Sequence, residues 1–546
     1  MLFGDVVAKA RFSNESTYRK FVEGGREQEF DMLFENAVKE VQRSFGGTYP
    51  MYIGGKPVNA GETITERSPI DFNMVLGNFQ NGTREHTLQA ISAAQRAFPS
   101  WGATDYKERA ALFRKAAELF AKERFRLAAI LSYENAKSRY ESIGEVDEAI
   151  DFMRYYASEL EANKGYKRNT SEKKSSAKES MGFQGAPPGL ERISIELKPY
   201  GVFGVIAPFN FPISISVGMS VGAMITGNTV VFKPSSEKMT MLTGLKIYEL
   251  FKAAGIPDGV FNYVTGPGSV IGAELAANDN VAGIAFTGSR EIGMGMLSKN
   301  LAAGKQKVFI LEMGGKNPAI VTKNAAIEKA VEGVASAAFG FAGQKCSALS
   351  RLYVHESIKE LFVSKLIEKL RTLKVGNPLE KANYIGPLIG ESAYVTYQRA
   401  VEKARKEGRI LYGGNRVNIG LQGYYVEPTL IEVMHSSDLV HRELFVPILT
   451  VEGFKGLDDA IAMANDTEYG LTAGFYGKSK KDIDQFCDRI LAGVVYVNRG
   501  ISATTGAMVG HHTFVGWKGS GLTGKGTGSK LYLQQFMHEK SISITK

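Results

Sequence analysis

Short apolar strands alternate with helices along most of the chain beyond residue 193, and this alternation restricts the fold more than any other feature. Strand-like segments such as YGVFGVIAP, NTVVFKP, VAGIAFTGS, KVFILEMGG and RLYVHES each end close to a glycine, proline or serine. Helical stretches, for example MTMLTGLKIYELFKAAG and AAIEKAVEGVASAAFGFAG, lie between them. The pattern predicts open, mostly parallel α/β sheets with helices on both faces. Ligands of such sheets bind beyond the carboxyl ends of the strands, so functional residues are expected there.

Size and composition agree with a large folded protein. A chain of 546 residues suggests two to four domains, at roughly 100–200 residues per domain. The net charge of +9 is small for this length, so no nucleic-acid partner is expected. No stretch approaches 18 apolar residues, and the first 20 residues lack the apolar core of a signal peptide. We therefore expect no membrane partner and a cytoplasmic location.

The first third of the chain contains further structural signals. Residues 27–45 predict an amphipathic helix, and residues 49–58 predict a β-hairpin that turns at Gly54–Gly55. A long helical region is expected to begin near Ser100 or Thr104. Residues 161–190 are polar and basic, which predicts a surface loop or linker.

The two cysteines have different surroundings. They are too few for a disulfide framework or a cysteine-based zinc cluster, and no metal site is expected. Cys346 lies in GQKCSA between a helix and a strand, among polar, turn-forming neighbours that are unusual for a core cysteine. Lys345 is a candidate for lowering the pKa of its thiol. Cys487 lies in IDQFCDRIL at helical spacing and is interpreted as a core residue, so Cys346 is the predicted nucleophile.

Two more strand ends carry groups that suit nucleophilic catalysis. Glu312 follows an apolar strand in VFILEMGG, where partial burial would raise its pKa toward that of a useful general base. Asn210 lies in APFNFP, where rigid prolines could fix its amide for hydrogen bonding to an oxyanion. None of the seven histidines lies beside another catalytic candidate, which disfavours a Cys/His protease.

Glycine-bearing turns at other strand ends could bind a phosphate. TGPG at 265–268 and FTGSREIG at 286–293 are the candidates, with Lys233 at the end of a further strand. Neither turn spells GxGxxG, because residue 271 is isoleucine. GSGLTGK at 519–525 resembles the start of a nucleotide-binding P-loop. Gly526 stands where that motif needs serine or threonine, so no NTPase site is expected.

Taken in order, PFNFP, KPSSE, FTGS, LEMGGK, GQKCSA, ELFVP and the glycine-rich tail resemble the aldehyde dehydrogenase superfamily from about residue 50 to 540. The resemblance implies an α/β fold with two open parallel-sheet domains and a β-strand oligomerisation arm. It implies N-terminal helices with the first part of the cofactor domain at 1–185, a first arm strand at 186–202 and the dinucleotide-binding domain at 203–311. A catalytic domain at 312–497 and a substrate loop with the second arm strand at 498–546 complete the division.

The same resemblance implies a homo-oligomer, a dimer or a higher assembly. The strand-like segments ISIELKPYG and KSISITK would form the arm and pair with another subunit. A terminal strand with alternating apolar residues needs such an edge partner.

The resemblance also implies roles for individual residues. Cys346 would attack a small-molecule aldehyde, Asn210 and the Cys346 backbone N–H would hold the oxyanion, and Glu312 would activate water. The implied cofactor is NAD or NADP, with Lys233 at the adenosine ribose, Glu443 at the nicotinamide ribose and Phe445 beside the ring. Further cofactor contacts would come from Ile206, Pro208, Phe209, Ser236, Gly268, Phe286, Gly288 and Ser289. A serine at 236, where a carboxylate would repel a 2′-phosphate, is expected to let NADP bind.

Within the superfamily, YPMYIGGKPV, GQKCSALSR and VNRGISATTGAMVGHHTFVGWKGSG resemble the 1-pyrroline-5-carboxylate dehydrogenase family. That family oxidises L-glutamate γ-semialdehyde to L-glutamate in proline degradation. The implied substrate contacts are Ser347, Gly506 and Ala507 at the carboxylate, with Phe514 and Phe211 at the rest of the molecule. TFVG departs from the family's PFGG. Two alternatives stay open: a broader semialdehyde dehydrogenase acting on succinate semialdehyde or a similar acid, and a non-catalytic binding protein on the same fold.

Overall fold

The computed structural model describes residues 12–174, 190–236, 239–500 and 508–545. Its first large sheet has seven strands, of which five are parallel and two form an antiparallel hairpin at one edge. In spatial order they are β12 (Val308–Glu312), β11 (Gly283–Thr287), β8 (Val202–Ile206), β9 (Thr229–Lys233), β10 (Phe261–Tyr263), β2 (Met51–Ile53) and β3 (Lys56–Val58). The β2–β3 hairpin confirms the one predicted at residues 49–58.

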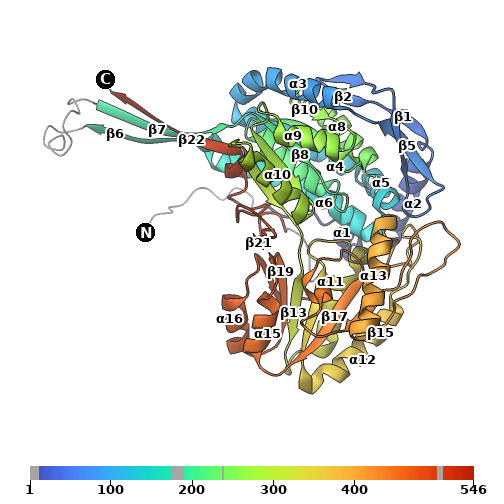
Figure 1. The fold of residues 1–546 in the computed structure, drawn as a ribbon. Helices are drawn as coiled ribbons and strands as arrows, with labels where there is room; N and C mark the ends of the chain where they lie inside the picture. Colours follow the sequence, from blue (N-terminus) through green and yellow to red (C-terminus); the bar gives the residue numbers. More distant parts are fainter. Residues whose placement is uncertain (1–11, 175–189, 237–238, 501–507, 546) are drawn as a thin grey trace.

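A second seven-stranded sheet forms the other domain, which lies below the first in Figure 1. Six strands are parallel and the edge strand β15 is antiparallel. The order is β15 (Arg409–Tyr412), β16 (Thr429–Glu432), β17 (Ile448–Phe454), β14 (Leu349–His355), β13 (Asn317–Val321), β19 (Thr472–Tyr476) and β20 (Val494–Val497). Its helices are α11 (Ile327–Phe339), α12 (Glu356–Thr372), α13 (Glu391–Glu407), α14 (Asp438–His441), α15 (Leu457–Asn465) and α16 (Lys480–Arg489). Cys487 lies on the exposed face of α16, where Phe486 is the buried neighbour, so its interpretation as a core residue was wrong. The predicted pair of parallel-sheet α/β domains is confirmed.

Helices of the first domain pack around its sheet. They are α1 (Thr17–Glu23), α2 (Glu27–Gln42), α3 (Arg84–Ala103), α4 (Tyr106–Lys122), α5 (Arg124–Asn135), α6 (Arg139–Ala162), α7 (Ser214–Ile225), α8 (Met241–Ala254), α9 (Ala273–Ala277) and α10 (Arg290–Ala302). Helix α2 confirms the helix predicted from residue 27. The predicted start near Ser100 or Thr104 was wrong, because α3 already begins at Arg84 and continues past Pro99. The next helix begins at Tyr106, where the Asp105 side chain accepts a hydrogen bond from the Lys107 N–H at 2.8 Å.

A three-stranded antiparallel sheet projects from the body of the molecule (Figure 1). It consists of β22 (Met537–Thr545), β7 (Leu190–Pro199) and β6 (Lys167–Lys174), in that order. One prediction is corrected here, because part of the predicted loop at 161–190 forms β6. The two predicted arm segments pair with each other, β22 with β7, over residues 537–545, and their pairing with another subunit stays a prediction. The alternating residues of β22 thus find a backbone partner within the chain, while β22 itself lies at an edge of this sheet.

Smaller sheets complete the fold. Strands β1 (Gly47–Tyr49), β5 (Val75–Gln80) and β4 (Thr63–Arg67) form one of them. The short strand β21 (Trp517–Lys518) pairs with β18 (Tyr469–Gly470) and fastens the C-terminal tail to the second domain. Among the described residues, no helix combines the length and the apolar character needed to cross a bilayer.

A buried ion pair fixes the start of α7, which follows the APFNFP turn. Lys137 and Glu145 hydrogen-bond to each other, and both side chains are fully buried. Glu145 also accepts hydrogen bonds from the backbone N–H groups of Ile213 (2.8 Å) and Ser214 (3.2 Å). The pair therefore ties α6 to the loop that carries Asn210.

Replacing Lys137 by methionine is expected to lower the free energy of unfolding by about 3–5 kcal/mol, because it leaves the Glu145 carboxylate buried without its partner. Lys480→Met is the matched control, because the Lys480–Asp484 pair is exposed and worth at most about 0.5 kcal/mol. Urea unfolding of both variants measures the difference. Equal losses would show that the buried pair has no special role.

Candidate active site

Cys346 follows a tight turn between α11 and β14. In this turn Phe341 and Ala342 both have φ near +52°, a left-handed conformation that non-glycine residues rarely adopt. The Asn317 side-chain amide, at the start of the neighbouring strand β13, donates to the carbonyl oxygens of Cys346 (2.7 Å) and Ala348 (2.8 Å). Sequence reasoning missed Asn317. Its position directly after LEMGGK was the available signal.

The glycine pair of LEMGGK lets two other segments approach the end of β12. A Cβ atom on Gly314 would lie 2.2 Å from Glu443 Oε2, and one on Gly315 would lie 2.3 Å from the Cys346 carbonyl oxygen. The Gly315 N–H donates to Glu443 Oε1 at 2.8 Å. Any larger residue at these two positions would push Glu443 or the Cys346 loop away from the strand end.

A cavity of about 1080 Å³ opens at the carboxyl ends of β8, β9 and β11 and reaches the second domain at Cys346. Twelve of the residues predicted for catalysis or cofactor binding line it. They are Ile206, Pro208, Phe209, Asn210, Lys233, Gly268, Phe286, Gly288, Ser289, Cys346, Glu443 and Phe445. The structure therefore brings residues from both domains to one site.

Asn210 lies close to the cysteine loop. Its side chain is buried, and its Nδ2 donates to the Gln344 carbonyl oxygen at 3.2 Å. The Gln344 side chain in turn accepts the Ile389 N–H at 2.8 Å. These contacts hold the Asn210 amide beside the segment that carries Cys346, which is the arrangement an oxyanion-binding amide needs.

The Cys346 thiol is neutral near pH 7. Burial raises its pKa to about 12, with further contributions from the negative charges of Glu443 and Glu312, while the Ser347 backbone N–H opposes the shift. Lys345 does not offset this effect, so the predicted role of Lys345 in lowering the thiol pKa was wrong. Its Nζ instead forms an ion pair with Glu141 Oε1 at 3.0 Å.

Glu312 ends β12 outside the cavity wall, close enough to Cys346 for its charge to affect the thiol. Burial raises the pKa of Glu312 to about 8, opposed by a hydrogen bond from the Gly516 backbone. Its Oε2 is buried and has no hydrogen-bond partner among the described residues. A carboxylate with a free oxygen and a pKa near 8 can take a proton from water at mildly alkaline pH.

Ser236 does not face the cavity. Its side chain is buried, and its Oγ accepts the Gly266 N–H at 3.0 Å, so it joins two strand-end turns. Its neighbour Ser235 lines the cavity instead. Because a hydroxyl that accepts one hydrogen bond can still donate another, the expectation that Ser236 meets a cofactor stays a prediction.

The residues predicted to contact the substrate do not line the cavity as the cofactor residues do. Ser347 is buried beside Cys346, and its carbonyl oxygen accepts a hydrogen bond from Thr472 at 3.3 Å. Lys137 Nζ lies 3.5 Å from the centre of the Phe211 ring. The Phe514 N–H donates to Thr527, and its side chain is half-buried. None of these three lines the large cavity, and Gly506 and Ala507 lie outside the described residues.

The cavity fits a dinucleotide. Its wall contains the glycines 268, 272, 288 and 295, which let a ligand approach the backbone closely. The N-terminus of α10 follows Ser289, and the partial positive charge of a helix N-terminus suits a pyrophosphate. Lys233 and Ser235 at one strand end and Glu443 across the cavity offer polar groups to two riboses. Phe209 and Phe445, whose ring centres are 5.8 Å apart, supply aromatic surface near Cys346.

Comparisons with known proteins show the family of this chain. The aldehyde dehydrogenase family model matches residues 58–542. A protein of Bacillus subtilis (strain 168) named 1-pyrroline-5-carboxylate dehydrogenase 2 is 35% identical, covering 93% of this chain and 95% of its own length. A protein of the same name from Geobacillus sp. (strain WCH70) is 32% identical over the same shares of the two chains. The crystal structure of 1-pyrroline-5-carboxylate dehydrogenase from Thermus with bound NAD superposes with a TM-score of 0.89 at 32% identity, covering 98% of this chain and all of that one. This chain belongs to the aldehyde dehydrogenase family.

Proposed function

We propose that this protein oxidises L-glutamate γ-semialdehyde, the open form of 1-pyrroline-5-carboxylate, to L-glutamate with NAD or NADP, in proline degradation. One observation supports the chemistry: Cys346, Asn210 and Glu443 line one cavity, and the half-buried Glu312 is close enough for its charge to affect the thiol. The names of the relatives support the choice of substrate.

Cys346 and Asn210 act in the first half of the reaction. The Cys346 sulfur bonds to the aldehyde carbon, the thiol proton passes to solvent water, and the electron pair of the carbonyl bond moves to the oxygen, which becomes an oxyanion. The Asn210 amide and the Cys346 backbone N–H stabilise this oxyanion by hydrogen bonds. When bound, the nicotinamide cofactor supplies the acceptor for the hydride that leaves the same carbon. Glu443 and Phe445 orient the cofactor, and the product of this half is a thioester on Cys346.

Glu312 acts in the second half. Its free carboxylate oxygen accepts a proton from a water molecule, whose oxygen attacks the thioester carbon. The carbon–sulfur bond then breaks, the Cys346 thiolate leaves and the carboxylic acid product is released. The Glu312 pKa of about 8 means that the base form is a minority at pH 7 and the majority above pH 8.

We also propose a homo-oligomer, a dimer or higher, in the cytoplasm. The projecting sheet β22–β7–β6 supports this assembly, because its edge strand β22 can pair with a second chain. The two free cysteines are consistent with a reducing compartment.

Initial rates with L-glutamate γ-semialdehyde, succinate semialdehyde and a small uncharged aldehyde, each with NAD and NADP, test the proposed substrate. Glutamate semialdehyde is expected to give the highest kcat/KM. Ser347→Ala is expected to raise its KM more than that of the uncharged aldehyde. A preference for succinate semialdehyde would support the broader alternative, and the absence of any aldehyde-dependent cofactor reduction would support a binding protein.

The rate of thioester hydrolysis should rise about tenfold per pH unit below pH 8 and level off above it, because only ionised Glu312 accepts the proton. Glu312→Gln should give a burst of reduced cofactor without turnover and should lack this pH dependence. Glu368→Gln, an exposed glutamate of α12, is the control and should keep the wild-type profile. Full turnover by Glu312→Gln would refute the assigned role.

Deletion of residues 537–546 should lower the molar mass measured by light scattering after gel filtration, because it removes the edge strand of the projecting sheet. Circular dichroism of the truncated chain controls for loss of the fold. An unchanged mass from a folded truncated chain would exclude β22 from the subunit interface.

A further inference from the structure

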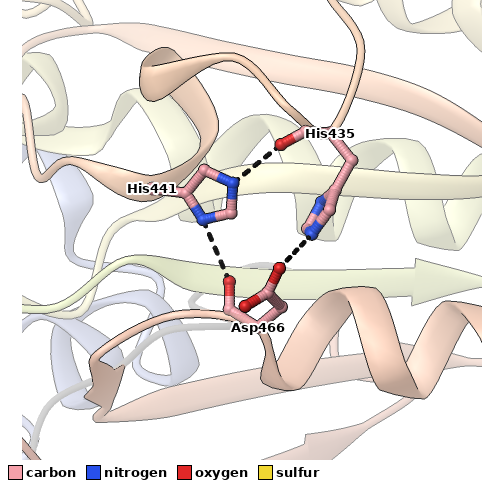
Figure 2. A group of neighbouring side chains, drawn as sticks. All are labelled: His435, His441 and Asp466. Atoms are coloured by element: carbon pink, nitrogen blue, oxygen red, sulfur yellow. Dashed lines mark hydrogen bonds and ion pairs between the residues drawn. The ribbon is translucent and has the colours of Figure 1, made fainter.

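Two histidines and an aspartate converge on the second domain, outside the wall of the large cavity (Figure 2). His435 follows β16, His441 ends α14, and Asp466 follows α15. One nitrogen or oxygen atom from each residue lies within 4.8 Å of the other two. Loops from three elements therefore bring together side chains that are common metal ligands.

The hydrogen-bonding pattern of His441 favours a cation at its Nδ1 atom. Its Nε2 lies 2.8 Å from the His435 carbonyl oxygen, and its Nδ1 lies 3.2 Å from the Asp466 carbonyl oxygen (Figure 2). Carbonyl oxygens only accept, and a neutral imidazole has one N–H. The shorter contact identifies Nε2 as the donor. Nδ1 then turns a lone pair toward an acceptor, unless a second proton or a metal ion binds it.

His435 has the complementary arrangement. Its Nε2 lies 2.9 Å from Asp466 Oδ2, and its Nδ1 lies 3.2 Å from the Tyr353 hydroxyl. In each imidazole one nitrogen is thus held by a protein group and the other faces Asp466. Histidine ligands of metal ions are oriented in this way by a hydrogen bond to the nitrogen that does not bind the metal.

We propose that His435 Nε2, His441 Nδ1 and the Asp466 carboxylate bind one divalent transition-metal ion, with Zn²⁺ as the best match. Zinc lies about 2.0–2.2 Å from such ligands, so its ligand atoms are about 3.3 Å apart in a tetrahedron. The 2.9 Å between His435 Nε2 and Asp466 Oδ2 is already close to that separation. A small movement of the His441 ring would complete the set, at the cost of its longer contact.

Surrounding charges favour a cation. A hydrogen bond from His435 lowers the pKa of Asp466, so its carboxyl is an anion at neutral pH. Glu452 supplies a second carboxylate, which accepts the His435 backbone N–H. Arg351 and Lys518 are nearby positive groups. The Arg351 guanidinium is held by the Met463 and Ala464 carbonyl oxygens, and the Lys518 ammonium is held by the Asn465 carbonyl oxygen. The Asp466 side chain is 67% exposed, which leaves room for water as a fourth ligand.

The position of the site gives the ion a structural role. His441 lies two residues before Glu443, and Asp466 follows α15. A bound ion would fasten the start of the segment that carries Glu443 and Phe445 to the end of that helix, at a place separate from the reacting atoms.

Zinc titration of the full chain against a chromophoric chelator tests the proposal, with Cys346→Ser and Cys487→Ser in every protein so that neither free thiol binds the metal. One Zn²⁺ per chain is expected. His441→Gln and Asp466→Asn should each weaken binding at least about tenfold. His538→Gln, an exposed histidine of β22, is the matched control and should bind as the parent does. Thermal melts in EDTA show whether each variant is folded.

Anomalous diffraction from zinc-soaked crystals provides a second, geometric test. A peak among the three side chains is expected. Absence of a bound zinc ion would overturn the proposal. Equal affinities of the parent, His441→Gln and Asp466→Asn chains would place any bound zinc elsewhere and would overturn it equally.

Discussion

The active site depends on the close approach of three chain segments at Gly314 and Gly315. Glu443 occupies the space that a side chain on Gly314 would fill, and the Cys346 carbonyl occupies the space beside Gly315. A single hydrogen bond, from the Gly315 N–H to Glu443, joins the first domain's last strand to the cofactor segment of the second. Gly314 and Gly315, which have no side chains, therefore determine how close Cys346, Glu443 and Glu312 can lie to one another.

Burial then sets the electrostatics of this site. Burial raises the pKa values of Cys346, Glu312 and Glu443, and the negative charges of the two glutamates raise that of Cys346 further. The resting thiol is protonated, and a thiolate needs a compensating positive charge nearby. Lys345 does not provide it, because Glu141 holds its ammonium group. A cationic ligand in the adjoining cavity would stabilise the thiolate, which couples the reactivity of Cys346 to occupancy of the cavity.

Much of the site could be predicted from sequence because parallel strands place their ends together. Asn210, Lys233 and Phe286 stand at or just after predicted strand ends, and they line one cavity. The direction in which a side chain points could not be predicted from the sequence in the same way. Ser236 turns to Gly266, Lys345 turns to Glu141, and Asn317 holds the cysteine loop from a neighbouring strand. Each of these contacts joins residues that are distant in sequence, so local pattern carries no signal for them.

The fold, like the site, has parts that could be predicted from sequence and parts that could not. Strand–helix alternation was sufficient to predict both α/β domains, whereas the basic 161–190 segment concealed a strand whose partner lies beyond it. Pairing between β7 and the C-terminal strand, more than 300 residues away, was likewise visible only in three dimensions. The His435–His441–Asp466 group escaped sequence reasoning for a related reason, since its members come from three separate loops.

The proposed mechanism depends on a covalent bond between Cys346 and the substrate. Peptide mass spectrometry of the Glu312→Gln chain, quenched in acid after mixing with glutamate semialdehyde and NAD, tests it directly. A stoichiometric acyl group is expected on the peptide that contains Cys346, and Cys487 is expected to stay unmodified. Cofactor reduction with no acyl group on Cys346, or with the acyl group on Cys487, would contradict it.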